Sequence, residues 1–302
     1  MTNIIGITGA SGMLGKHLIH ILSKKKIKII STSRKRVYFK NKRFQWKKLD
    51  LMKLKNEKPL KKIFENINTV VHLGALVPLG SHQNRDKIKK TNFESTVIMA
   101  KWAIKNDIHF IYISGAIIYD TQNNKKIKED SLIKKNFLKD YYGQSKRNCD
   151  VFLQKKIKLK KKITILRPTS IYGCGLNKNK IMMKLIRLTK LNKPIKLYEP
   201  FEKINLIHAN DVVKAIYKSI IKKKFKIFNI GSDKLYSIID LSKILININK
   251  SKSRLKIIKD MNKKVVLNKY NISSNKAKNN LNWKNKIGIK NGLKLVIEKK
   301  YE

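Results

Sequence analysis

Short apolar runs alternate along the chain with longer segments that mix apolar and polar positions. A run of four to six apolar or β-branched residues is typical of a buried strand. The segments between the runs, such as 11–22 and 91–105, are long enough for crossover helices. This rhythm predicts an α/β fold built on a doubly wound parallel sheet with right-handed crossovers. The runs cover residues 4–8, 27–32, 70–73, 110–114 and 163–167.

The alternation of strand-like and helical segments becomes less regular from about residue 174. The chain therefore divides into a first part, 1–173, and a second part, 174–302, which is expected to form a small α+β lobe. The elements predicted in the second part are a turn at 192–194, strands at 204–208 and 225–230, and helices at 212–221 and 292–299.

Three glycines follow the first apolar run. A strand that enters such a turn and leaves it as a helix is typical of a dinucleotide-binding site. Gly9 permits the tight turn, Gly12 lets backbone N–H groups approach a pyrophosphate, and Gly15 lets the helix pack closely. The phosphates would lie at the positive end of the helix dipole. The predicted cofactor contacts are Gly9, Ser11, Gly12, Met13, Leu14 and Gly15.

A tyrosine and a lysine stand four residues apart in Tyr142-Gly143-Gln144-Ser145-Lys146. On a helix this spacing places both side chains on one face. A nearby ammonium favours the phenolate and lowers the pKa of the phenol from about 10 toward the working range of a general base. The pair predicts that Tyr142 is an acid/base and that Lys146 tunes it, although such a spacing also arises by chance in a lysine-rich chain.

Together, the glycine turn and the Tyr142–Lys146 pair resemble the short-chain dehydrogenase/reductase superfamily. They resemble most its extended branch, the NAD(P)-dependent epimerases, dehydratases and reductases of sugar nucleotides. The resemblance covers nearly the whole chain. It implies a Rossmann-like cofactor domain at 1–173 and, at 174–302, a mainly substrate-binding lobe interwoven with the main sheet. It also implies a homodimer formed through two helices per subunit, near 91–105 and 143–156.

The resemblance implies further cofactor contacts in the first part of the chain. Asp50 and Leu51 resemble the adenine-side pair, and Leu73-Gly74-Ala75 resembles the end of the fourth strand. Asn92 resembles an Asn that opens a helix, and Pro168 lies in the turn beside the nicotinamide. For each of these residues a structural role is the alternative.

The end of the second strand bears on the choice between NAD and NADP. An Asp or Glu there accepts hydrogen bonds from the ribose 2′-OH of NAD. This chain has Ser33-Arg34-Lys35-Arg36 instead, so no carboxylate repels a 2′-phosphate and the Arg34 guanidinium can clamp one. Because arginine is rare in this chain, we predict NADP as the preferred cofactor over NAD, with contacts from Ser33 and Arg34. Ordinary surface cations are the alternative.

Gly115 departs from the family pattern. In the family a Ser or Thr four residues before a Tyr bonds the reacting oxygen, and counting back from Tyr119 leads to Gly115. Ser114 is one residue earlier, where a strand would point its side chain to the opposite face. Either Ser114 or a bound water takes this catalytic role, or the site is depleted. The dehydratases carry an added acid/base pair that Ala116-Ile117 lacks, so dehydration is the least favoured reaction.

Substrate contacts are expected in the later part of the chain. In the family an Arg grips the pyrophosphate of the sugar nucleotide, and this chain has Ile204 at that position with Lys203 beside it. Lys263 or Lys264 falls near a second family Arg. Either Lys has replaced Arg as a point charge for phosphate, or the substrate lacks a pyrophosphate. His208 is a further candidate contact, with a partly buried structural histidine as the alternative.

The formal net charge of +52 admits a nucleic-acid hypothesis, since Lys and Arg contacts to phosphate dominate such binding. Only eight of the 71 basic residues are Arg, and basic residues occur in every segment. A drift toward A/T-rich codons explains this spread better than one functional surface does, so no specific nucleic-acid partner is predicted. Cys149 and Cys174 indicate neither a disulfide nor a metal site. With no apolar run near 18 residues, a cytoplasmic protein is expected.

These features favour an enzyme that epimerises or reduces a nucleotide-linked sugar, for a surface polysaccharide, by hydride transfer at a carbinol carbon. One alternative is an NADPH-dependent reductase of a non-sugar carbonyl. Another is a catalytically weak dinucleotide-binding protein that acts by interaction. Nucleic-acid binding through the basic surface is a third.

Overall fold

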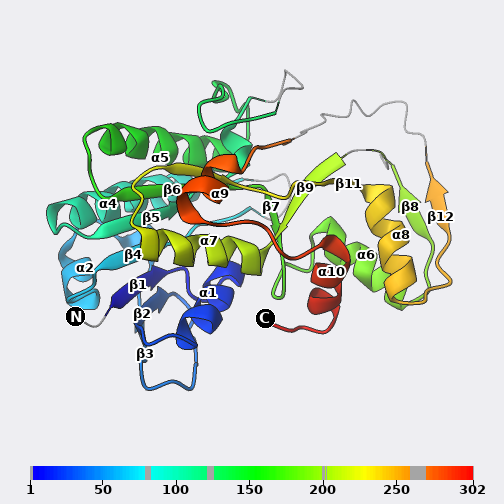
Figure 1. Cartoon of the computed structure of the whole chain (residues 1–302), viewed down its shortest axis with the longest axis horizontal. Coiled ribbons are helices and arrows are strands. Elements are labelled where there is room, and N and C mark those ends of the chain that lie inside the picture. The colour runs from blue at the N-terminus through cyan, green and yellow to red at the C-terminus, as the bar shows by residue number, and fades with distance from the viewer. Residues whose placement is uncertain are drawn as a thin grey trace.

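A parallel sheet forms the centre of the computed structural model, which describes residues 3–78, 83–120, 126–198, 201, 203–258 and 270–301. Its seven strands run in the order β10-β6-β5-β4-β1-β2-β3 (Figure 1), and every neighbouring pair is parallel. The order reverses at β1, and ligands of open α/β sheets bind at the carboxyl ends of the strands near such a point. The predicted doubly wound parallel sheet is confirmed. The strands are β1 (Ile4–Thr8), β2 (Lys28–Ser33), β3 (Phe44–Lys48), β4 (Thr69–His72), β5 (His109–Ile113), β6 (Ile163–Pro168) and β10 (Ile227–Ile230).

Helices cover both faces of this sheet (Figure 1). On one face α1 and α7 lie side by side, and apolar residues such as Leu18 and Ile216 fill the space beneath them. On the other face α2, α4 and α5 bury a second set that includes Phe110 and Leu153. The helices are α1 (Met13–Ser23), α7 (Ala209–Lys222), α9 (Asn275–Leu281), α2 (Lys58–Ile63), α4 (Ser95–Lys105) and α5 (Tyr141–Lys158). Short helical segments lie between them at η1 (Leu51–Lys53), α3 (Arg85–Ile88), η2 (Lys89–Glu94) and η3 (Ala116–Ile118).

The second half of the chain contributes to both parts of the molecule. Its β10, α7 and α9 belong to the main sheet and its first face. Its other elements surround a separate apolar core that includes Leu185, Leu245 and Leu293. These elements are β7 (Ser170–Tyr172), β9 (Lys203–His208) and β11 (Leu235–Ser237), which form one small sheet, β8 (Ile195–Leu197) and β12 (Leu255–Ile257), which form another, and α6 (Ile181–Lys190), α8 (Ile238–Ile248) and α10 (Ile289–Ile297).

The helix predicted at 212–221 begins earlier, at Ala209. His208 is its N-cap, and the Nδ1 atom of this side chain accepts a hydrogen bond from the Asn210 N–H at 3.2 Å. Asp211 lies in the first turn, where its carboxylate accepts the backbone N–H groups of residues 286 and 287 at 3.0 and 2.9 Å. A side-chain cap that the periodicity did not reveal therefore sets the start of α7.

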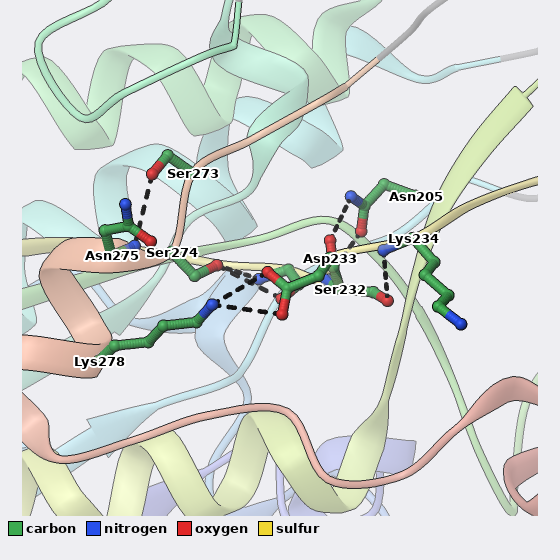
Figure 2. A network of polar contacts seen from close by, with 9 residues as sticks. Asn205, Ser232, Asp233, Lys234, Ser273, Ser274, Asn275 and Lys278 are labelled. Carbon is green, nitrogen blue, oxygen red and sulfur yellow. Dashed lines mark hydrogen bonds and ion pairs between the residues drawn. The ribbon is translucent and has the colours of Figure 1, made fainter.

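Small polar side chains connect the loop after β10 by hydrogen bonds to β9 and to the start of α9 (Figure 2). Asn205 of β9 donates to the Ser232 carbonyl at 2.9 Å and accepts the Ser232 N–H at 3.0 Å. Ser274, which precedes α9, accepts the Gly231 N–H at 3.0 Å. One turn therefore connects the main sheet, the three-stranded sheet and α9.

An ion pair in the interior joins α5 to β6. The side chains of Asp150 and Arg167 are both 0% exposed. Arg167 donates to the Asp150 carboxylate through Nε at 3.0 Å and Nη2 at 2.6 Å, and to the Tyr119 hydroxyl through Nη1 at 2.7 Å. Tyr119 in turn donates to Asn229 Oδ1 at 2.7 Å. This network fixes α5 against β6 and β10.

We expect Asp150→Ala to lower the free energy of unfolding by about 3–5 kcal/mol, because it leaves the Arg167 charge buried without its partner. Denaturant unfolding measures the change. Glu57→Ala serves as the control, since Glu57 pairs with the exposed Lys61 and surface ion pairs contribute little. Equally small effects of the two substitutions would contradict a structural role for the buried pair.

Candidate functional site

The turn between β1 and α1 brings three backbone segments into close contact. Gly9 has a φ of +72°, and a Cβ atom there would lie 2.7 Å from the Gly74 nitrogen. A Cβ atom on Gly15 would lie 2.4 Å from the Gly9 carbonyl oxygen. Both distances are too short for a side chain, so glycine is required at both positions. The turn therefore lies directly against the chain after β4 and the first turn of α1.

A pocket of about 240 Å³ lies beside this turn, at the carboxyl ends of β1, β2 and β4. Ten predicted cofactor contacts line it, namely Gly9, Ser11, Gly12, Ser33, Arg34, Asp50, Leu51, Leu73, Gly74 and Ala75. The sequence reasoning missed five lining residues, Thr8, Thr32, Leu49, Leu76 and Thr91. Each of the five directly adjoins a predicted contact in the sequence, which is the signal that could have identified it.

Met13, Leu14 and Gly15 form the first turn of α1, with Gly12 as the N-cap. The first N–H groups of a helix have no acceptor within the helix, and the helix dipole is positive at this end. Since Ser11 and Gly12 line the pocket, the start of α1 gives one side of the pocket the character of an anion-binding site.

A buried chain of hydrogen bonds supports the turn. The Gly74 N–H donates to Thr8 Oγ1 at 3.1 Å, and the Thr8 hydroxyl donates to His72 Nδ1 at 2.7 Å. The His72 Nε2–H then donates to Thr96 Oγ1 at 2.9 Å. Burial and the nearby Lys146 lower the pKa of His72 to about 3. The ring is therefore neutral and holds β1, β4 and α4 together.

The side chains of two predicted cofactor contacts, Asn92 and Asp50, form hydrogen bonds with the backbone of the protein. Asn92 is 2% exposed and pairs with the backbone of Leu76: its Oδ1 accepts the Leu76 N–H at 2.7 Å, and its Nδ2 donates to the Leu76 carbonyl at 3.0 Å. Asp50 caps η1 by accepting the Met52 N–H at 3.1 Å. Asn92 therefore shapes the pocket through Leu76, which lines it.

The end of β2 presents a cation to the pocket. Ser33 donates through Oγ to the Lys35 carbonyl at 2.5 Å and accepts the Trp46 Nε1–H at 2.9 Å. Arg34 lies between Ser33 and Lys35, the two residues that the first of these bonds joins. Its side chain is exposed and lines the pocket. The bonds on both sides of Arg34 limit the conformations of this loop.

Tyr142 and Lys146 lie on the same face of α5. Lys146 is buried, and its ammonium donates to the Ile113 carbonyl at 2.6 Å. The same Nζ atom is 4.9 Å from the centre of the Tyr112 ring and 5.9 Å from that of the Tyr142 ring. The ammonium is therefore beside Tyr142 but bonded to the end of β5.

The pKa of Tyr142 differs from the value that the sequence predicted. Burial and the Asp140 carboxylate raise this pKa to about 12, whereas a lowered value was expected from the neighbouring lysine. The physical reason is that the phenolate would be desolvated, while the Lys146 ammonium is directed to a carbonyl. Burial also lowers the pKa of Lys146, to about 8.

The start of α5 explains the glycine after Tyr142. Asp140 is the N-cap, and its Oδ1 accepts the Gly143 N–H at 3.0 Å. A Cβ atom at Gly143 would lie 2.4 Å from Asp140 Oδ2 and 2.7 Å from the Phe137 ring. Only glycine at this position lets the cap close over the first turn, which carries Tyr142.

Ser114 and Gly115 follow β5 at the carboxyl edge of the sheet. Ser114 is 5% exposed, and its hydroxyl has no hydrogen-bond partner among the described residues. Gly115 has an extended backbone. A Cβ atom there would approach Ile117 only to 3.5 Å and the carbonyl oxygen of Pro168, at the end of β6, to 3.9 Å. A serine would therefore fit at position 115.

Two of the predicted substrate contacts lie at opposite ends of β9. Lys203 begins the strand and is exposed. His208 ends it and is fully buried, with its ring centre 5.9 Å from that of His17 and 5.1 Å from that of Tyr172. Burial lowers the pKa of His208 to about 4, and this enclosed, neutral ring favours the structural alternative. Lys263 lies outside the described residues.

In the described part of the chain, none of the helices has the length and apolar character that a membrane span needs. The same residues contain no group of three or more His, Cys, Asp or Glu side chains that could hold a metal ion.

Two relatives of known activity align with much of the chain. dTDP-D-glucose 4,6-dehydratase of Dictyostelium discoideum is 28% identical over 272 residues, which are 80% of this chain and 61% of that protein. GDP-6-deoxy-D-talose 4-dehydrogenase of Aggregatibacter actinomycetemcomitans is 25% identical over 258 residues, which are 83% of this chain and 81% of that protein. The chain thus spans less than two thirds of the first relative and most of the second.

A solved structure shares the fold over almost the whole length. UDP-glucuronic acid 4-epimerase from Bacillus cereus, in complex with UDP-glucuronic acid and NAD, has a TM-score of 0.83 and 20% identity, with 98% of each chain covered. The family model described as "NAD dependent epimerase/dehydratase family" matches residues 5–231, which include the glycine turn, the pocket and α5. The resemblance inferred from the sequence motifs is therefore confirmed: this chain belongs to the NAD-dependent epimerase/dehydratase family.

Proposed function

We propose that this protein is an NAD(P)-dependent enzyme that epimerises or reduces a nucleotide-linked sugar, with Tyr142 as the acid/base. The proposal rests above all on the placement of Tyr142, Lys146 and the unbonded Ser114 hydroxyl around the end of β5, with β4 and its pocket next in the sheet. The substrate class is supported by the relatives, which by name act on dTDP-, GDP- or UDP-linked sugars.

The residues present fit a nicotinamide dinucleotide. The glycine turn keeps side chains away from the start of α1, where the N–H groups of Ser11, Met13 and Leu14 would bind the pyrophosphate. The Gly12 N–H already donates to the Gly9 carbonyl at 3.0 Å. Lys146 and Pro168 would border the nicotinamide and its ribose. The Ser114 hydroxyl, unpaired among the described residues, would gain a partner, since a buried polar group without one costs free energy. When bound, the nicotinamide gives or takes a hydride.

The protein would hold and move the proton. Tyr142, with a pKa of about 12, is protonated at neutral pH and can donate to the oxygen of a keto sugar during reduction. In the reverse direction it would accept the hydroxyl proton. Lys146, with a pKa of about 8, is mostly charged at neutral pH, so it would stabilise the phenolate as it forms and bind the ribose. Ser114 would hydrogen-bond the reacting oxygen.

NADP is the cofactor that we propose as preferred. The exposed Arg34 lines the pocket, and the bonds of Ser33 to its neighbours hold this loop. No carboxylate occurs in residues 33–36 to repel a 2′-phosphate. The preference depends on these residues of the chain itself, because the solved relative contains NAD.

Gly115 supports a second candidate function, a dinucleotide-binding protein of weak catalytic activity that acts by interaction, because the hydroxyl usual in the family is absent from that position. Reduction of a non-sugar carbonyl with NADPH would use the same site and would differ only in substrate. A homodimer through the helices at 91–105 and 143–156, and a cytoplasmic location, stay predictions.

Arg34→Ala is expected to weaken NADP(H) binding by about 1.5–3 kcal/mol, the contribution of a hydrogen bond to a charged group, and to change NAD binding little. Isothermal titration calorimetry with both cofactors measures this. Arg36→Ala is the matched control, since that guanidinium lies over the Tyr38 ring at 4.8 Å. Equal losses for the two cofactors, or tighter binding of NAD by the wild type, would rule out the NADP preference.

Tyr142→Phe should lower turnover of an identified substrate at least 10²-fold, within the usual range for a general acid–base group, while cofactor binding survives. Lys146→Ala should impair both turnover and cofactor binding. Tyr141→Phe, which removes a hydroxyl from the adjacent residue of α5, should have little effect. Near-normal turnover by Tyr142→Phe would refute the assignment.

Ser114→Ala should lower turnover by about 10²–10³, the effect of losing one preorganised donor, whereas Gly115→Ser should change it little. Steady-state kinetics of the two variants measure both effects. The reverse pattern, a gain from Gly115→Ser and no loss from Ser114→Ala, would show a depleted site. No effect of either variant would favour the non-catalytic function.

A further inference from the structure

A residue far from α5 in the sequence completes the cap of that helix. Gln83, partly buried, follows β4 and precedes α3. Its Oε1 accepts the Tyr142 N–H at 2.8 Å, and its Nε2 donates to Asp140 Oδ1 at 3.2 Å. The two partners fix the orientation of the amide, because an N–H group must face its oxygen and a carboxylate must face its NH₂ group.

The segment that carries Gln83 holds α5 at a second point. Asn92 donates through Nδ2 to Ser145 Oγ at 3.2 Å, and the Ser145 hydroxyl donates to the Tyr142 carbonyl at 2.7 Å. Asn92 also pairs with the backbone of Leu76 in the pocket wall. Residues 83–92 therefore bond the N–H of Tyr142 directly, through Gln83, and its carbonyl indirectly, through Asn92 and Ser145.

The N–H of Tyr142 is one of those that an α-helix leaves without an internal acceptor, because Tyr142 is the second residue of α5. The Gln83 amide supplies this acceptor and at the same time holds the N-cap carboxylate. Loss of both bonds would leave the first turn of α5 to fray into solvent, and the phenol of Tyr142 would move with it.

We propose that Gln83 is a positioning residue for Tyr142, which holds the first turn of α5 so that Tyr142 stays partly buried beside Lys146. This inference rests on the proposed role of Tyr142. Gln83 acts through the backbone of α5 and through Asp140, without contacting the reacting atoms.

The titration of Tyr142 reports its position without any substrate. The charged groups that face it are Asp140 at the cap and Lys146 one turn along α5, and Tyr112 of β5 lies beside Lys146. Burial is the largest cause of the pKa of about 12. A phenol released into solvent would therefore titrate nearer its ordinary value of about 10.

The experiment follows the phenol of Tyr142 by NMR in protein labelled with ¹³C at tyrosine Cζ, with Tyr142→Phe identifying the resonance. Gln83→Met keeps the length of the side chain and removes both hydrogen bonds, so we expect the pKa of Tyr142 to fall by about one unit or more. Gln144→Met makes the same change at an exposed position of α5 and should have no effect.

An unchanged pKa of Tyr142 in folded Gln83→Met would overturn the proposal, as would an equal fall in Gln144→Met. Thermal unfolding shows whether each variant is folded. If Gln83→Met does not fold, Gln83→Asn, whose amide is too short to reach both partners, carries the same expectation. Full turnover by Tyr142→Phe would instead refute the proposed function and leave the titration result standing.

Discussion

The close approach of the backbone at Gly9, Gly15 and Gly74 is the constraint on which the site depends. A Cβ atom at Gly9 would lie 2.7 Å from the Gly74 nitrogen, and one at Gly15 would lie 2.4 Å from the Gly9 carbonyl oxygen. The contact therefore exists only because Gly9 and Gly15 have no side chain. The contact places the start of α1 and the chain after β4 on two sides of the pocket. Leu51, in the segment after β3, lies against Gly74 and lines the same pocket. The pocket and its anion-binding end both follow from this contact.

Burial governs the electrostatics at the other end of the site. Lys146 is buried and Tyr142 is partly buried, and the loss of hydration moves their pKa values in opposite directions, to about 8 and about 12. These shifts leave both groups protonated at neutral pH, which suits a proton donor and a cation that stabilises its conjugate base. Asp150, on the following turn of α5, pairs with the buried Arg167 and anchors this helix to β6, so the helix that carries Tyr142 and Lys146 has a fixed support.

Local patterns in the sequence predicted most of the fold and one wall of the site. The apolar runs and the glycine spacing are local signals. Because the carboxyl ends of parallel strands lie along the same edge of a sheet, ten residues predicted from such signals line one pocket. No apolar run marks β3 (Phe44–Lys48), because it is a half-exposed edge strand with mixed residues. The bond of Lys146 to the Ile113 carbonyl and the reach of Gln83 to α5 depend on contacts between distant segments, which no local pattern records.

A crystal structure of the protein with bound NADP would test the central proposal most directly. We predict the pyrophosphate at the N–H groups that begin α1, the 2′-phosphate within reach of Arg34, and the nicotinamide between Tyr142 and Pro168. A dinucleotide bound outside this pocket, or bound in it with the nicotinamide directed away from Tyr142, would contradict the proposed enzyme and its acid/base.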